Sequence, residues 1–141
     1  MSAISFLDTN ILLYAGSNSP QDAGKKSRAI QLIRSAPFAI SAQVLQEFIA
    51  NALTKKSLGF TEANIVATIQ NLSGVATQPI TREIVEQAWH LRQRFQISHW
   101  DAAILAAALE LGCQTLYSED FTHGQHYDSV TVINPFLEES A

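Results

Sequence analysis

With 141 residues, of which 47% are hydrophobic and 16% charged, the chain is long enough to bury a core, and one domain spanning residues 1–141 is predicted. Nine Lys and Arg residues against thirteen Asp and Glu residues give a net charge of −4, which argues against bulk nucleic-acid binding. The single cysteine, Cys113, excludes an internal disulfide framework and favours a reducing cytoplasm, and the lack of a long apolar run or a basic N-terminal start argues against a membrane span or a signal peptide.

The first half of the chain alternates between short apolar runs and amphipathic stretches. Ile4 to Leu7 is too short and too rich in Ile and Phe for an amphipathic helix, so it is predicted to be a buried strand. The elements predicted after it are a helix from about Asn10, a loop over 16–24, a helix ending before Pro37, a strand over 38–40 and a helix from Ser41 to about Lys56. The last of these helices has one apolar stripe, formed by Val44, Leu45, Phe48, Ile49, Ala52 and Leu53.

The second half continues this alternation. Its predicted elements are a helix from Thr61 to Gly74, a short or edge strand within 75–80, a helix over 81–95, a helix over 102–111, and strands over 115–117 and 130–133. The helix over 102–111 is apolar all round except for Glu110, so it is predicted to be buried, and Gly112 is expected to end it. Strands separated by helices predict an α/β fold, a three-layer sandwich in which helices flank a mostly parallel central sheet of about four to five short strands.

Polar residues stand at the ends of two predicted strands. Asp8, Thr9 and Asn10 follow the first strand directly, and Asp120 follows a late one. In a parallel α/β sheet, ligands bind just beyond the carboxyl ends of the strands, so both carboxylates are candidate site residues. The alternatives are structural, because Asp8 or Thr9 can cap the following helix and Asp120 can form a turn.

Two further acidic residues lie on predicted helices. Asp101 ends the sequence Ser98-His99-Trp100-Asp101 at the first turn of the apolar helix, where Ser-x-x-Asp is also the pattern of a capping box. A carboxylate has enough acceptor sites to cap a helix and bind a ligand at once. Glu47 lies on the side of its helix opposite to the apolar stripe, so periodicity alone predicts a solvated side chain.

The order and spacing of these residues resemble those of a PIN domain, the fold used by VapC-type toxin ribonucleases. The residues that carry the resemblance are Asp8-Thr9-Asn10 after the first strand, followed by Glu47, Asp101 and Asp120. The resemblance spans essentially the whole chain, and it implies that Glu47 lies in a cleft with the other three acids. The family pattern of a small hydroxyl residue, a variable residue and Asp favours Asp120 over its neighbour Glu119, which is a rival ligand.

Convergence of four carboxylates implies a cation, because without one they would repel one another, and all-oxygen ligation selects Mg²⁺ or Mn²⁺. The resemblance implies hydrolysis of RNA phosphodiester bonds, with the catalytic metal ligands Asp8, Glu47, Asp101 and Asp120. Thr9 and Asn10 are expected to orient a water or a carboxylate by hydrogen bonds. The implied partners are an RNA substrate, a cognate antitoxin protein whose C-terminal segment fills the cleft, and a second copy of the chain in a homodimer.

Two other functions fit part of the pattern. A haloacid-dehalogenase-like phosphatase also places an Asp after its first strand over Mg²⁺, but it needs a second Asp where this chain has Asn10. A non-catalytic interaction module would keep the fold without the chemistry, although all four acidic positions are filled. His123 and His126 form a His-x-x-His motif, but no Cys or further His stands at a spacing that supports zinc binding, so a polar loop is favoured.

Overall fold

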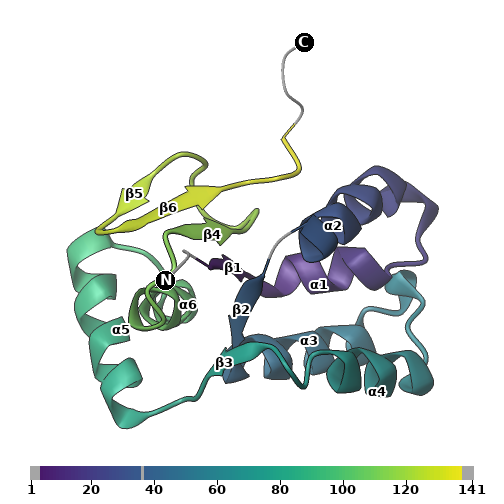
Figure 1. Cartoon of the computed structure of the whole chain (residues 1–141), viewed down its shortest axis with the longest axis horizontal. Coiled ribbons are helices and arrows are strands. Elements are labelled where there is room, and N and C mark those ends of the chain that lie inside the picture. Colours follow the sequence, from purple (N-terminus) through teal and green to yellow (C-terminus); the bar gives the residue numbers. More distant parts are fainter. Residues whose placement is uncertain (1–3, 36, 138–141) are drawn as a thin grey trace.

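The computed structural model describes residues 4–35 and 37–137 (Figure 1). Within these residues one sheet has the strand order β3-β2-β1-β4-β6-β5. Its strands are β1 (Ser5–Leu7), β2 (Phe38–Ser41), β3 (Ala76–Gln78), β4 (Thr115–Tyr117), β5 (His126–Tyr127) and β6 (Val130–Ile133). The helices are α1 (Thr9–Gly16), α2 (Ala23–Ser35), α3 (Ala42–Thr54), α4 (Glu62–Asn71), α5 (Arg82–Phe95) and α6 (His99–Glu110), with short 3-10 helices η1 (Pro20–Asp22) and η2 (Lys56–Leu58). None of these described helices is long and apolar enough to cross a membrane.

Strand β1 occupies the middle of the sheet. It pairs in parallel with β2 on one side and with β4 on the other, so that Phe6 lies opposite both Ala39 and Leu116. Strands β3 and β6 extend the sheet in parallel on the two sides. The predicted mostly parallel sheet is therefore confirmed. The short antiparallel strand β5, which pairs with β6, is not predicted from the sequence, because two residues are too few to show a period.

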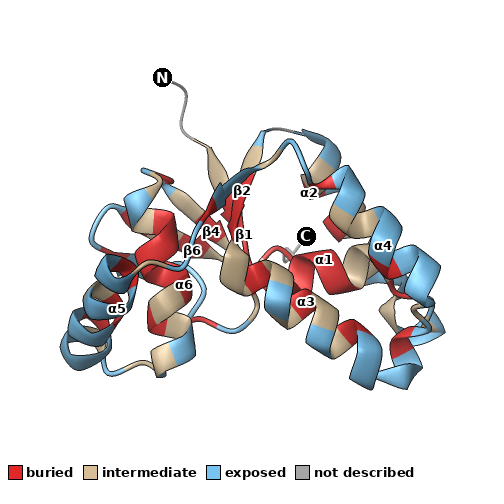
Figure 2. Cartoon of the chain, turned by 90° about the horizontal axis from the view of Figure 1, so that it is seen from below, coloured by how far each residue is buried: buried red, intermediate tan, exposed pale blue. Residues whose placement is uncertain are grey.

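Helices cover both faces of the sheet, as the predicted three-layer sandwich requires. Figures 1 and 2 show α1 to α4 on one side of the sheet, and α5 and α6 on the other. Helix α6 packs against β2, β6 and α5, and its residues 104–108 are all buried, as its all-round apolar sequence predicts. Gly112 follows α6 with a φ of 73°, the left-handed conformation that commonly ends a helix.

The outer helices bury narrower faces than their apolar residues suggest. Helix α3 buries three residues spaced four apart, whereas Leu53 is 56% exposed, so the predicted stripe is wrong at that position. In α5, Val85 and Trp89 are about half exposed. A helix buries only the ridges of side chains that face its neighbours, and an apolar residue at the margin of a stripe stays in contact with solvent.

Candidate active site

The ends of β1 and β4 bring the two strand-end aspartates to the same edge of the sheet. The backbone N–H of Asp8 donates to the carbonyl of Tyr117 at 3.0 Å, which extends the parallel pairing by one residue. The next residue along, Ser118, is fully buried and donates from Oγ to Oδ2 of Asp8 at 2.7 Å. The segments that follow the neighbouring strands β1 and β4 thus contact each other through the side chains of Asp8 and Ser118, as expected for two parallel strands that end at the same edge of a sheet.

Asp8 caps a helix and also belongs to the acidic cluster. Its Oδ1 accepts a 2.7 Å hydrogen bond from the N–H of Thr9 at the start of α1, while Oδ2 faces Ser118. The side chain is buried, and the pKa of Asp8 is raised from 3.8 to about 7. Burial is the largest cause, the hydrogen bonds from Ser118 and Thr9 lower the pKa, and the charges of Asp120 and Glu47 contribute to raising it. Helix capping and a site role therefore coexist in one carboxylate.

Glu47 is joined to the end of β1 by a hydrogen bond. Thr9 donates from Oγ1 to Oε1 of Glu47 at 2.7 Å, and Gln43 donates from Nε2 to Oε2 at 3.1 Å. Glu47 is half-buried, so the solvated side chain that periodicity alone predicts is wrong. The reason is that α3 packs against α1 as well as against β2, which gives it a second covered side.

Asn10 connects the first and last parts of the site. Its Nδ2 donates to Oδ2 of Asp120 at 3.3 Å and to Oγ of Ser118 at 3.5 Å, and Ser118 Oγ also accepts from the N–H of Asp120 at 3.0 Å. The amide oxygen of Asn10 is buried and has no hydrogen-bond partner within the described part of the chain. A buried acceptor without a donor is costly, and a bound water or cation would satisfy it.

The structure separates the two neighbouring acids Glu119 and Asp120. Glu119 accepts a hydrogen bond of 2.6 Å from the hydroxyl of Tyr14 and forms a 3.0 Å ion pair with Lys25. These bonds hold Glu119 against α1 and α2, whereas Asp120 is exposed and contacts Asn10. The geometry agrees with the choice of Asp120 as the site residue.

Asp101 lies in the first turn of α6 and is half-buried. Its N–H donates to Oγ of Ser98 at 3.1 Å, so Ser98 caps this helix. Within the described residues the Asp101 carboxylate makes no return bond to the N–H of Ser98, so only half of the capping box that the sequence suggested is formed. Burial raises the pKa of Asp101, and the negative charges of Asp120 and Glu47 raise it further, although Ser98 has a lowering effect. Asp101 is therefore near enough to both acids to interact electrostatically with them.

Sequence reasoning overlooks the residues that orient these acids. Ser118 contacts Asp8, Asn10 and Asp120, and Gln43 links Glu47 to the backbone carbonyl of Trp100 at 3.1 Å. The only signal for Ser118 is its place two residues before Asp120 at a strand end. Gln43 carries no signal, because it becomes informative only once α3 and α6 are known to be neighbours.

The donor set suits a hard divalent cation. It consists of carboxylate oxygens and the unpartnered amide oxygen of Asn10, which are the ligand types that Mg²⁺ and Mn²⁺ prefer. Within residues 4–35 and 37–137, no three or more Asp, Glu, His or Cys side chains are gathered closely enough to enclose a metal ion. In this structure the described acidic side chains therefore do not by themselves form a complete ligand set for an ion.

The other reactive side chains do not join this cluster. Nδ1 of His123 accepts from the N–H of Asn134, and Nδ1 of His126 lies 3.0 Å from Oγ1 of Thr131, so each ring is engaged by its own loop or strand. Cys113 is buried, and burial raises the pKa of its thiol to about 11, which makes it a poor nucleophile. The polar loop predicted for the two histidines is found at His123, whereas His126 lies in strand β5.

Comparisons with known proteins point to one family. Residues 5–125 match the PIN domain family, and no curated protein matches the chain. Among solved structures, a toxin–antitoxin complex from Klebsiella pneumoniae has a chain that is 25% identical, with a TM-score of 0.69, over 96% of this chain and 98% of that one. VapC20 of Mycobacterium tuberculosis, described as a Sarcin-Ricin loop cleaving toxin, is also 25% identical, with a TM-score of 0.65, over 82% of this chain and 89% of that one.

A third solved structure is similar in fold. It is VapBC2 from Rickettsia felis bound to a DNA fragment from its promoter, with 21% identity and a TM-score of 0.63 over 92% of this chain and 96% of that chain. All three comparisons extend over most of both chains, so the similarity concerns the whole fold rather than one motif.

Proposed function

This chain belongs to the PIN domain family, and we propose that it is a ribonuclease that hydrolyses RNA phosphodiester bonds with the help of Mg²⁺ or Mn²⁺. The observation that carries the proposal is the convergence of Asp8, Glu47, Asp101 and Asp120 at one edge of the sheet, where burial and, to a lesser extent, the charges of Asp120 and Glu47 raise the pKa of Asp8 to about 7. Accumulated carboxylate charge of this kind is unfavourable for the protein alone and favourable for a protein that binds a cation.

In such a site the acidic residues would bind the cation, and their hydrogen-bond partners would hold the carboxylates in position. Asp8 and Asp120 would hold the cation, with Glu47 and Asp101 reaching it directly or through water. A bound ion would supply a water of lowered pKa and would stabilise negative charge on the phosphoryl oxygens. Ser118 fixes Asp8 by its 2.7 Å hydrogen bond, Thr9 and Gln43 hold the two oxygens of Glu47, and Asn10 holds Oδ2 of Asp120.

Two of those donors have distinct tasks. Thr9 holds Glu47 through Oγ1, which fixes the direction of one carboxylate oxygen at the end of β1. Asn10 donates to Asp120 and keeps its amide oxygen unpartnered, so that this oxygen can accept a hydrogen bond from a water within the site. Deprotonated Asp8 is required for cation binding, so activity is expected to rise as the pH increases through the range where Asp8 loses its proton.

The biological role that we propose is that of the toxin in a type II toxin–antitoxin pair, acting in the cytoplasm. The Klebsiella pneumoniae chain comes from a toxin–antitoxin complex, and VapC20 is described as a toxin that cleaves the Sarcin-Ricin loop; both cover most of this chain at 25% identity. A cognate antitoxin would block the acidic site, and two copies of the chain would associate as a homodimer.

The decisive experiment is cleavage of a mixed RNA pool by the purified protein with Mg²⁺, with Mn²⁺ and with EDTA. The Asp8→Asn and Asp101→Asn variants change one oxygen to nitrogen, and Asn still caps a helix, so the fold is expected to survive. Metal-dependent cutting that both variants lose supports the proposal. Equal cutting by wild type and variants identifies a contaminant, and folded protein that binds no Mn²⁺ and cuts nothing supports a non-catalytic interaction module instead.

A further inference from the structure

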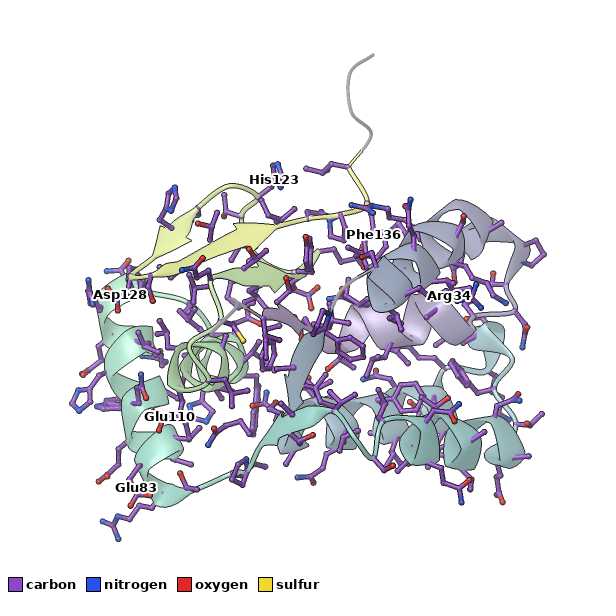
Figure 3. The ribbon with its side chains drawn as sticks, in the orientation of Figure 1. Arg34, Glu83, Glu110, His123, Asp128 and Phe136 are labelled. Atoms are coloured by element: carbon purple, nitrogen blue, oxygen red, sulfur yellow. The ribbon has the colours of Figure 1, made fainter. Side chains whose placement is uncertain are left out.

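A wide groove lies beside α2 and the segment that follows β6. It has a volume of about 1100 Å³. Its lining includes Lys25 and Arg28 from α2, His123 from the loop after β4, and the stretch from Ile133 to Leu137. Figure 3 shows His123 and Phe136 at the edge of the molecule where the C-terminal segment leaves, with Phe136 beside α2.

This groove adjoins the acidic site. The N–H of Ser118 donates to the carbonyl of Ile133 at 3.1 Å, so the groove's wall at Ile133 runs alongside the turn that carries Asp120. On the opposite wall, Lys25 is paired at 3.0 Å with Glu119, the residue before Asp120. A chain-like ligand lying in the groove would therefore continue directly toward the carboxylates.

The charge of the groove is opposite to that of the chain as a whole. The chain has a net charge of −4, yet the described residues that line this groove include Lys25 and Arg28 and no Asp or Glu, although Lys25 is paired with Glu119 beside the groove. Arg28 donates from Nε to the carbonyl of Pro135 and from Nη1 to the side-chain oxygen of Gln31. The rest of its five N–H groups remain available to a ligand.

Two more lining residues are held in place for polar contacts. Because Nδ1 of His123 accepts from Asn134, the neutral ring carries its proton on Nε2 and can donate it. Lys25 lies over the rings of Tyr14 and Phe136, with its Nζ 4.7 Å and 5.6 Å from their centroids, which fixes the ammonium at the groove wall.

We propose that this groove binds the phosphates of single-stranded RNA that flank the scissile bond. The inference rests on the proposed ribonuclease function and adds the path of the substrate to it. An acidic cleavage site repels a polyanion, so a nuclease with few basic residues gains affinity by placing cations next to that site rather than spreading them. Arg28 is so placed and has no carboxylate partner among the described residues, whereas Lys25, one turn away on α2, is already paired with Glu119 and has one N–H left to donate to a phosphate.

Gly24 allows a test that removes no existing contact. It lines the groove, belongs to α2, and a Cβ added there meets nothing within 4 Å. Gly24→Glu would put a negative charge in the groove, Gly24→Lys a positive one, and Gly24→Gln is the control of matched size. Anisotropy of a fluorescein-labelled, mixed-sequence single-stranded RNA would be measured across a range of salt concentrations, in the Asp8→Asn background so that the probe is not cut.

The expected result is an order of affinities in which Gly24→Lys exceeds Gly24→Gln and Gly24→Glu binds least. One added phosphate contact should also steepen the dependence of log K on log salt by about 0.7 for a single strand in the Gly24→Lys variant. Arg28→Gln should make the slope shallower by a similar amount, about 0.7, and Arg28→Lys should restore it. Arg34→Gln is the control on the same helix, since Arg34 is exposed in its last turn and does not line the groove.

The outcomes separate this inference from the proposed function. If the wild-type protein cuts RNA but the Gly24 and Arg28 variants all bind the probe with one affinity and one salt slope, the groove is not a phosphate site, and the nuclease proposal stands. If the wild-type protein neither cuts nor binds RNA, both proposals are overturned. If Gly24→Glu leaves RNA binding intact and abolishes binding of a protein partner, the groove is a protein-docking surface, and the inference is wrong.

Discussion

Thr9 Oγ1 donates a 2.7 Å hydrogen bond to Oε1 of Glu47, and this bond joins the end of the central strand to the middle of helix α3. Without it, Glu47 would have only Gln43 as a donor and would be free to rotate toward solvent. The contact makes Thr9 a positioning residue for an acid that is 38 positions away in sequence.

Replacing Thr9 by Val removes this hydroxyl and keeps the side-chain shape. We expect kcat for RNA cleavage to fall about tenfold, equivalent to about 1.4 kcal/mol of transition-state stabilisation, and the free energy of unfolding to fall by about 1 kcal/mol. Single-turnover cleavage and urea unfolding would measure the two effects. Thr9→Ser keeps the donor and should retain most activity; full activity in Thr9→Val would show that Glu47 needs no orientation.

Asp8 should make the metal-free protein less stable as the pH rises. Its pKa is about 7 in the folded state against 3.8 for an ordinary Asp, so between about pH 4 and pH 7 the folded protein holds a proton that the unfolded chain has released. The unfolded state binds fewer protons in this window, and the free energy of unfolding therefore falls with increasing pH.

Asp8→Asn should abolish that part of the pH dependence. At pH 7.5 in EDTA we expect the variant to be more stable than the wild type by at least about 1.4 kcal/mol, the equivalent of one pKa unit. Urea unfolding at several pH values would show it. Glu62→Gln changes an exposed acid at the start of α4 and serves as the control. Parallel stability curves for wild type and Asp8→Asn would contradict the assignment.

Divalent cations should reverse this instability. Mg²⁺ or Mn²⁺ at about a hundred times its dissociation constant should add about 2.7 kcal/mol to the free energy of unfolding, and EDTA should remove that gain together with RNA cleavage. Binding should release protons near pH 6.5, because Asp8 must ionise to meet the cation. Calorimetric titration in two buffers of different ionisation enthalpy measures this release, and its absence in wild type would rule out Asp8 as a ligand.

Removing the charge of Asp120 should affect RNA cleavage far more than removing the charge of its neighbour Glu119. Asp120→Asn is expected to lose cleavage, because Asp120 contacts Asn10 at the site. Glu119→Gln should keep most of it, since Glu119 faces Tyr14 and Lys25. The partly exposed pair with Lys25 contributes at most about 1 kcal/mol to stability. Side-by-side rates and melting temperatures test this, and equal loss of activity in the two variants would mean that Glu119 also serves the site.

The fold was predictable from the sequence where one local pattern determined each element. Residues 115–117 form a strand between turn signals, and α6 is buried because it is apolar all round. The caps at Ser41 and Thr61 are present because short hydroxyl side chains satisfy the first free N–H groups of a helix. Strand β5 could not be predicted, because its two residues owe their conformation to pairing with β6.

The sequence predicted the position of a site residue only where that residue directly follows a strand. Asp8 and Asp120 follow parallel neighbours, so topology alone brings them together. Glu47 could not be placed in the same way, because helical periodicity describes one covered side and α3 has contacts with both α1 and β2. Leu53 is the converse case, an apolar residue at the margin of a stripe that no neighbouring element covers.

The central position of β1 also fixes when the protein becomes active. A ribosome makes the chain from its N-terminus, so Asp8 emerges well before its partner Ser118, which lies 110 residues later. A nascent chain that has been made only as far as β3 has no β4 to pair with β1 and lacks both Ser118 and Asp120. The proposed nuclease therefore cannot complete its site until β4 and the turn that carries Ser118 and Asp120 have been made.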